Sequence, residues 1–241
     1  MGDGAGLVAG CVRATAARAG TGQVHGRVEV RSDIPASRGL KSSSAVSNVV
    51  VLATARALGR NLEDSELLDI AIDESIRAKV TVTGAFDDAA ACYYGGLVVT
   101  DNTCRTVLRT GSLDPALSVV LHIPDRTIPK DQVDKARFGE LKREFDTALE
   151  LTVKGDYPRA IEVNSMATAR ALDLSDEASE AAREAGAYAA GITGTGPASF
   201  ALCAGDVVEA VEKIFSQFGG RTVRASLNTV PSKEVIPRLL S

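Results

Sequence analysis

The sequence predicts a mixed α and β protein that folds as two compact halves. The chain has 241 residues, which at about 100–200 residues per domain allows one large domain or two small ones. Stretches with the apolar spacing of helices alternate irregularly with short stretches typical of strands. A turn-rich region at residues 112–116 separates the two groups of elements. We therefore expect one half over residues 1–114 and the other over 115–241.

Composition excludes several classes of protein. Net charge is −4, whereas a dedicated nucleic-acid binder usually carries a basic face. No apolar run approaches the roughly 18–20 residues of a membrane span. Two histidines are too few for a multi-histidine metal centre, and the four cysteines form no CxxC pair. We expect small-molecule partners, no nucleic acid, no membrane and a reducing cytoplasm.

The elements of the first half follow from local patterns. Polar and apolar residues alternate over 27–31, which is typical of a half-buried strand. Apolar spacing over 45–58 is helical, and Gly59 is a suitable C-terminal stop. The segment 80–83 is β-branched throughout and favours an extended chain. In order, we expect helices over 5–19, 45–58, 64–77 and 89–94, and strands over 27–31, 80–83 and 97–100.

The second half is predicted to open with a strand over 117–123 that Pro124 ends. Dense charge over 125–143 indicates a solvated loop that enters a helix. A glycine loop over 191–197 is expected between a helix and a strand. The full set is helices over 137–153, 157–171, 176–190 and 206–218, and strands over 117–123, 199–203 and 221–230.

The loop before the helix at 45–58 has the chemistry of an anion site. Backbone N–H groups at a helix N-terminus lack helical partners, and the helix dipole adds positive potential. Gly39 permits close backbone approach, Lys41 adds a charge, and Ser42, Ser43 and Ser44 offer hydroxyls to phosphate oxygens or Mg²⁺. A serine N-cap is the alternative reading of any one of them. Walker A and Rossmann spacings do not fit.

Two further segments are candidates for chemistry. Asp87 and Asp88 stand together after a glycine, where one can be a base for a hydroxyl nucleophile, a metal-associated carboxylate or simply a helix cap. Gly191, Gly194 and Gly196 fall within six residues, and this entropic cost indicates a geometric need. A tight helix-to-strand turn is the alternative. That order is the reverse of the dinucleotide-binding fingerprint.

Together these segments resemble the motifs of the GHMP small-molecule kinases. The segment from Pro35 to Ala45 is similar to the family's Pro-x-x-x-Gly-Leu-x-Ser-Ser phosphate loop, and Gly191 to Ala198 is similar to its C-terminal glycine motif. Within the family, Lys41 with the triple serine, and residues 81–89, resemble archaeal-type shikimate kinase.

This resemblance implies a two-domain α+β GHMP-kinase-like fold with ATP between the halves. The N-terminal half would be ribosomal S5 domain 2-like and the C-terminal half ferredoxin-like. Few residues precede the first expected strand, so the first N-terminal strands of the family are expected to be lacking.

The resemblance also implies roles for single residues. Asp87 aligns with the catalytic aspartate, and Asp88 would cap the following helix. Ser43 and Glu74 would contact Mg²⁺. The residues expected to bind ATP are Pro35, Ser37, Gly39, Leu40, Lys41, Ser42, Ser43, Ser44, Gly194, Thr195 and Gly196.

The implied reaction is ATP-dependent phosphorylation of the shikimate 3-hydroxyl, in the pathway to chorismate and the aromatic amino acids. Shikimate is a carboxylate, so an arginine is expected in its pocket. The residues left open for this role are Arg105, Arg109, Arg126 and Arg137. Two alternatives remain, a GHMP kinase of the homoserine or mevalonate type and a non-catalytic regulator that binds ATP or a metabolite. The sequence leaves the oligomeric state open.

Overall fold

The computed structural model describes residues 4–81, 85–128 and 134–239, which divide into two compact units. Unit 1 draws on residues 1–36, 41–112 and 228–241, and unit 2 on residues 37–40 and 113–227. Each unit has its own cluster of buried apolar side chains. Among the described helices, none combines the length and the apolar character needed to cross a bilayer.

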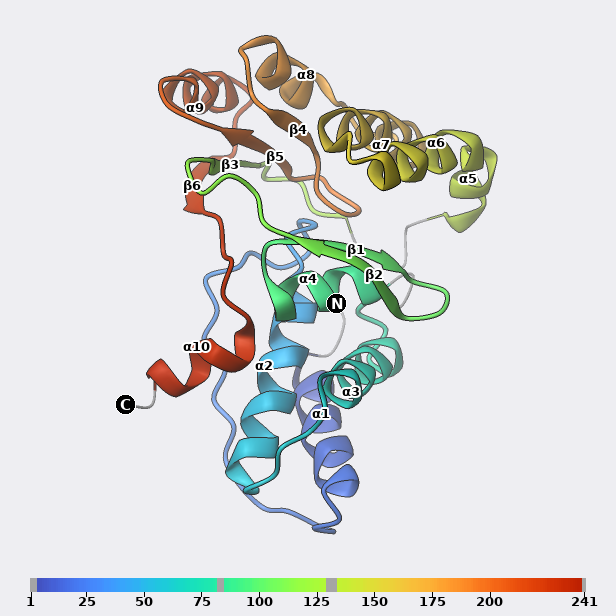
Figure 1. The fold of residues 1–241 in the computed structure, drawn as a ribbon, viewed down its shortest axis with the longest axis vertical. Coiled ribbons are helices and arrows are strands. Elements are labelled where there is room, and N and C mark those ends of the chain that lie inside the picture. Colours follow the sequence, from blue (N-terminus) through green and yellow to red (C-terminus); the bar gives the residue numbers. More distant parts are fainter. Residues whose placement is uncertain (1–3, 82–84, 129–133, 240–241) are drawn as a thin grey trace. The chain divides into compact units, whose positions relative to one another are not determined.

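Unit 1 is a group of helices with one β-hairpin. Helices α1 and α3 pack against α2, and Figure 1 shows these three side by side. Leu7 of α1, Val51 of α2 and Leu67 of α3 are almost fully buried in the shared core. The elements are α1 (Gly4–Arg18), α2 (Ser42–Ala57), α3 (Asp64–Arg77), α4 (Phe86–Tyr94), β1 (Leu97–Asp101), β2 (Thr106–Gly111) and α10 (Ser232–Leu239).

Local capping and the C-terminal segment complete unit 1. Helix α3 begins with a capping box, in which Glu63 and Glu66 satisfy each other's backbone N–H groups. The chain returns to this unit at residue 228, where Asn228 accepts a hydrogen bond from the Gly96 N–H at 2.7 Å. Helix α10 is joined to α4 by a hydrogen bond of 2.8 Å from Ser232 Oγ to the Cys92 carbonyl.

Unit 2 is an antiparallel sheet covered by helices. Helices α8 and α9 pack on the sheet through Ala182, Val211 and Phe215, which are fully buried with Val120 of β3. The elements are β3 (Ser118–Ile123), α5 (Lys135–Glu140), α6 (Lys142–Lys154), α7 (Tyr157–Leu172), α8 (Glu177–Glu184), β4 (Ala189–Ile192), β5 (Ser199–Cys203), α9 (Val207–Gln217) and β6 (Arg221–Ser226).

The strand order in unit 2 is β4-β5-β3-β6, and every neighbouring pair is antiparallel. Chain order here is one strand, a run of helices, a two-strand hairpin, one helix and a last strand. This is the β-α-β-β-α-β arrangement of ferredoxin-like folds. The expected mixed α and β fold with a ferredoxin-like second half is therefore confirmed.

One predicted strand is wrong. Residues 27–31 form no strand in the structure. Their alternation is real, but no strand of the described chain pairs with them, and Val28 and Val30 remain 49% and 39% exposed. A strand needs a partner for its backbone groups, which a local pattern does not supply. In the predicted extended segment 80–83, Val80 and Thr81 belong to no strand, and residues 82–83 lie outside the described residues.

Several element boundaries also differ. The helix predicted over 176–190 ends at Glu184, because Gly186 adopts a φ of 95° and the chain then enters β4. The alanines of β4 favour a helix locally, but pairing with β5 overrides that preference. The helix predicted over 137–153 is interrupted at Leu141, and the last strand ends at Ser226. Strand β2 and helix α10 were not predicted.

Candidate functional site

The N-terminus of α2 presents backbone donors to its surroundings. The first helical bond runs from the Ala45 N–H to the Lys41 carbonyl at 3.0 Å. The N–H groups of Ser42, Ser43 and Ser44 therefore have no partner within the helix. Lys41 precedes them with a φ of 61°, a left-handed conformation that reverses the chain into the helix. This end of α2 has the donors and the positive potential of an anion site.

The preceding residues of the predicted phosphate loop belong to unit 2, where they contact the glycine motif. Thr193 Oγ1 donates to the Gly39 carbonyl at 3.1 Å, and the Ala198 N–H donates to the Arg38 carbonyl at 3.2 Å. Gly39 has a φ of 77°, and a Cβ there would lie 2.2 Å from the Thr193 carbonyl oxygen. Two motifs separated by about 150 residues in sequence are therefore packed backbone to backbone.

The glycine motif is a hairpin connection and not the predicted helix-to-strand turn. Gly191 pairs with Phe200 and Ile192 with Ser199, so both belong to β4. The loop proper covers residues 193–198 and joins β4 to β5. Gly194 and Gly196 adopt φ values of 58° and 62°, which are readily available to glycine. The inferred geometric need therefore holds for Gly194 and Gly196, in a strand-to-strand turn, whereas Gly191 belongs to the strand.

A buried polar network under this hairpin was not predicted. The Ile192 N–H donates to Ser165 Oγ at 2.7 Å, and that hydroxyl donates to Asp176 at 2.5 Å. Arg183 donates to Asp176 at 2.9 Å and to the Ala190 carbonyl at 2.8 Å. The network ties β4 to α7 and α8 and thereby orients the loop that follows. Only tertiary contact identifies these residues, since their spacing in sequence matches no motif.

The paired aspartates occupy the first turn of α4. The helix begins at Phe86 with Ala85 as the N-cap, so the prediction that Asp88 caps the helix is wrong. Ala85 takes a left-handed conformation, with a φ of 48°, and the helix starts before either aspartate. Asp88 instead forms an ion pair with Lys41. Asp87 exchanges hydrogen bonds with Asn102, a residue that sequence reasoning missed.

The starts of α2 and α4 are tied together within unit 1. Asn48 of α2, which is buried, donates to the Ala89 carbonyl of α4 at 2.8 Å. The ion pair between Lys41, which precedes α2, and Asp88, in the first turn of α4, joins the starts of the two helices. Burial raises the pKa of the nearby Cys92 thiol to about 11; Asp88 adds to this shift and Lys41 opposes it. A pKa this high favours the neutral thiol of Cys92 at physiological pH.

The two predicted Mg²⁺ ligands have different surroundings. Ser43 is half-buried at the N-terminus of α2, beside the predicted phosphate donors. Glu74 of α3 is buried, pairs with Arg77, and packs against α1 where Gly10 leaves room for its carboxylate. Among the described residues, no group of three or more His, Cys, Asp or Glu side chains could hold a metal ion. Ser43 offers a hydroxyl oxygen and Glu74 a carboxylate oxygen, and oxygen atoms are the ligands that Mg²⁺ prefers.

The four arginines considered for a carboxylate differ in their surroundings. Arg105 donates to Asp73 at 2.8 Å and to Asp69 at 3.2 Å, and the hydrogen bond to Asp73 is the main cause of its raised pKa. Arg137 donates to the Arg170 carbonyl at 3.0 Å. Arg109 and Arg126 are exposed. Arg105 is already neutralised by two carboxylates, which weakens the case for it as a substrate ligand.

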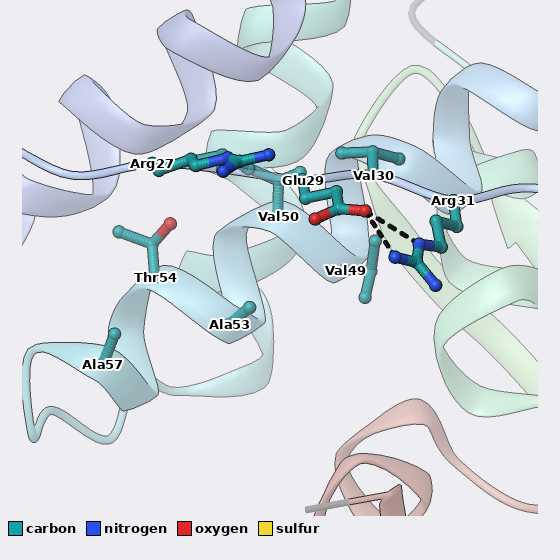
Figure 2. Close-up of a pocket in the computed structure, with 10 residues that line it drawn as sticks. Arg27, Glu29, Val30, Arg31, Val49, Val50, Ala53, Thr54 and Ala57 are labelled. Atoms are coloured by element: carbon teal, nitrogen blue, oxygen red, sulfur yellow. Dashed lines mark hydrogen bonds and ion pairs between the residues drawn. The ribbon is translucent and has the colours of Figure 1, made fainter.

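Two hollows in unit 1 lie away from the predicted site residues. One, of about 400 Å³, is lined by residues 27–31 and by α2 (Figure 2). There Glu29 and Arg31 pair with each other, and Val49, Ala53 and Ala57 belong to the adjoining face of α2. The other, of about 1020 Å³, is lined by α1, α2 and residues 22–30. Neither lining includes the predicted phosphate-loop, aspartate or glycine-motif residues.

Two family models match the chain. The model described as GHMP kinases N terminal domain matches residues 6–96, and the one described as GHMP kinases C terminal matches residues 159–220. The first span contains the α2 N-terminus, Glu74 and the paired aspartates, and the second contains the glycine motif.

Three shikimate kinases are similar to this chain in sequence over most of its length. The chain is 43% identical over 206 residues to a shikimate kinase of Methanothrix thermoacetophila, covering 84% of this chain and 69% of the relative. It is 33% identical over 207 residues to a shikimate kinase of Methanobrevibacter smithii, covering 84% and 71%. For a shikimate kinase of Pyrococcus furiosus, the identity is 36% over 191 residues, covering 79% and 68%.

Solved structures share the fold at low identity. A homoserine kinase from Cytophaga hutchinsonii aligns with a TM-score of 0.67 at 20% identity, covering 93% of this chain and 76% of that one. The Methanococcus jannaschii mevalonate kinase aligns with a TM-score of 0.65 at 15% identity, covering 92% and 75%. At these identities the likeness concerns the fold alone.

Proposed function

The chain belongs to the GHMP kinase family, and on this premise we propose that it phosphorylates the 3-hydroxyl of shikimate with ATP. The observation that carries the proposal is the 43% identity to a curated shikimate kinase over 84% of this chain. Kinases for homoserine and mevalonate match the fold at 15–20% identity, which is too low to transfer an acceptor. A cytoplasmic location is part of the same proposal.

The N-terminus of α2 is the proposed site for the ATP phosphates. The N–H groups of Ser42–Ser44 and the helix dipole favour bound anions. Positioning and charge neutralisation provide most of the acceleration in phosphoryl transfer. Lys41 adds a positive charge at the same end of α2, held in place by its ion pair with Asp88. Gly194, Thr195 and Gly196 of unit 2 are also proposed to contact the phosphates.

Asp87 is the proposed base. It would orient the shikimate 3-hydroxyl and accept its proton as the oxygen attacks the γ-phosphorus atom of ATP, while the bond from that phosphorus to the β–γ bridging oxygen breaks and ADP leaves. Its carboxylate is exposed in the first turn of α4, and Asn102 holds its Oδ1 atom. An exposed but anchored carboxylate can reach a substrate hydroxyl without a large loss of side-chain entropy.

Mg²⁺ is proposed to bind with ATP. When bound, it offsets negative charge on the β- and γ-phosphate oxygens. Ser43 would offer its hydroxyl from the N-terminus of α2. Glu74 is the proposed carboxylate ligand, and it would have to exchange its ion pair with Arg77 for the cation.

The decisive experiment measures ADP release with ATP, Mg²⁺ and one acceptor at a time. Shikimate, homoserine and mevalonate are compared at equal concentrations, and the product is identified by mass spectrometry. We expect turnover with shikimate and little with the other two. Turnover with homoserine or mevalonate alone would assign a different acceptor, and ATP binding without any turnover would indicate a regulator.

The base is tested by Asp87→Asn. Asparagine preserves the shape of the side chain and an oxygen for the bond from Asn102, but it cannot accept the proton. We expect kcat to fall at least about 10²-fold, with the KM for ATP changed less than about threefold. Asp146→Asn on α6 is the matched control, because among the described residues the exposed Lys142 is the partner of Asp146. Full activity of Asp87→Asn would reassign Asp87 to helix stabilisation.

A further inference from the structure

The turn after β1 places an amide beside the proposed base. Asn102 Nδ2 donates to Asp87 Oδ1 at 2.9 Å, and the Asp87 N–H donates to Asn102 Oδ1 at 3.0 Å. Thr100 Oγ1 also donates to Asn102 Oδ1 at 2.9 Å. All three residues belong to unit 1, so these contacts lie within one compact body.

These contacts define the orientation of the Asn102 amide. A backbone N–H can only donate, so the Asn102 atom that faces the Asp87 N–H must be the oxygen. The Thr100 hydroxyl bonds to the same oxygen. The Nδ2 group is therefore directed to the Asp87 carboxylate, to which only a donor can be a favourable partner at this distance.

Asn102 contributes little to the packing of unit 1. It is exposed, in a hairpin turn, and outside the apolar core of unit 1. Within the described chain, Asp87 Oδ2 has no hydrogen bond, while Oδ1 is held by Asn102. The pair therefore restrains one carboxylate oxygen of an exposed residue and leaves the other without a hydrogen bond in the described chain.

We propose that Asn102 is a positioning residue for the phosphoryl transfer, which holds the Asp87 carboxylate in the orientation needed to accept the acceptor hydroxyl. The inference rests on the proposed role of Asp87 as the base. Asn102 acts through Asp87 and does not itself touch the reacting atoms.

Asn102→Asp separates this role from a structural one. Aspartate keeps an oxygen acceptor for the Asp87 N–H and the Thr100 hydroxyl, and a negative charge is favourable near the N-terminus of α4. It removes only the Nδ2 donor and sets a second carboxylate against the first. We expect kcat to fall about 10–100-fold, with the KM for ATP within twofold and the chain still folded at the assay temperature. A kcat within twofold of wild type would overturn the proposal.

A double mutant tests whether Asn102 acts through Asp87. In the Asp87→Asn background, adding Asn102→Asp should cause no further loss of kcat, since the group to be positioned is already inactive. An additional loss equal to that seen in the wild-type background would show that Asn102 acts by another route.

Asp101→Asn is the matched control in the same turn. Asp101 accepts the N–H groups of Thr103 and Cys104 at 2.8 and 3.1 Å, and asparagine retains the acceptor oxygen. We expect its kcat to equal that of wild type. A loss as large as that of Asn102→Asp would mean that the turn as a whole, and not the amide, matters.

A readout independent of the acceptor keeps this inference separate from the proposed function. Asn102→Ala should move the carboxyl ¹³C signal of Asp87 in the labelled full chain, because one hydrogen-bond donor is lost. An unmoved signal would contradict the contact itself, whatever the substrate. Turnover of the wild-type protein with shikimate as the acceptor tests the proposed function by itself. If the wild-type protein instead phosphorylates another acceptor, the ratio of variant to wild-type kcat is measured with that acceptor.

Discussion

At the scale of single residues, Gly39 allows a close backbone contact because it has no Cβ atom. Its φ is positive, and three backbone atoms of the glycine motif, from Thr193 and Gly196, lie within 3.0 Å of the position a Cβ would take. Backbone atoms cannot move aside as the end of a flexible side chain can. Any other residue would strain the local backbone and separate the two segments.

We predict that Gly39→Ala destabilises the protein more than Gly205→Ala. Gly205 also has a positive φ, but a Cβ there would meet nothing within 4 Å, so it reports the backbone strain of about 1–2 kcal/mol alone. Gly39→Ala should cost a further 1–3 kcal/mol or so, because its Cβ overpacks the backbone of the hairpin loop. Urea unfolding of both variants measures the difference; equal losses would contradict the close contact.

At the scale of elements, α10 is held to α3 by charge and hydrogen bonds. Lys233 donates to the Asp64 carboxylate at 2.9 Å, and Tyr93 Oη donates to the same side chain at 2.8 Å. Burial opposes ionisation of Asp64, but the bonds from Lys233 and Tyr93 and the Lys233 charge outweigh it, so the pKa of Asp64 is lowered. The hydrogen bond to Asp64 is the main cause of the raised pKa of Lys233.

These shifts predict how stability depends on pH. A carboxyl whose pKa is lowered by folding stabilises the protein above its unfolded value of about 3.9, and this contribution is lost as pH falls through the folded pKa. Asp64→Asn should therefore lower the free energy of unfolding by about 1 kcal/mol at pH 7. The difference from wild type should shrink as pH falls below about 3.9, where the unfolded carboxyl becomes protonated. Urea unfolding at pH 7 and at a series of lower pH values checks this, and a difference that does not shrink would show another cause.

At the scale of the whole molecule, two separate apolar cores support the two units. Leu68 is buried with its neighbours in α1 and α2, and Phe215 is buried with the sheet of unit 2. The expected boundary at residues 114 and 115 stays a prediction. The compact units are discontinuous in sequence, because residues 37–40 belong with unit 2 and residues 228–241 with unit 1.

We predict that a cavity in one core loosens chiefly its own unit. Leu68→Ala should cost about 2–5 kcal/mol and Phe215→Ala about 3–5 kcal/mol. Hydrogen exchange followed by mass spectrometry should then show faster exchange in α1–α3 for the first variant and in β3–β6 for the second. Equal acceleration in both units for either variant would mean that the chain unfolds as one cooperative body.

The sequence by itself determined the mixed α and β fold, most helices, and the three segments that bear the candidate chemistry. Those features depend on local order: apolar spacing for α2 and α3, and glycine, serine and aspartate at short separations in the motifs. Local patterns failed where a partner was needed. Residues 27–31 alternate like a strand, but no strand in the described part of the chain pairs with them. Strand β4 forms from helix-favouring alanines because β5 lies beside it.

Only the tertiary structure decided which distant residues meet. It packs Gly39 against Thr193, pairs Lys41 with Asp88, and sets Asn102 on Asp87. Each contact joins residues whose separation carries no periodic signal, and each depends on a turn or helix start that differs from the local prediction. A sequence pattern indicates which structure a segment favours on its own. A site depends instead on contacts between distant segments, and those contacts stabilise the protein only after the segments have folded together.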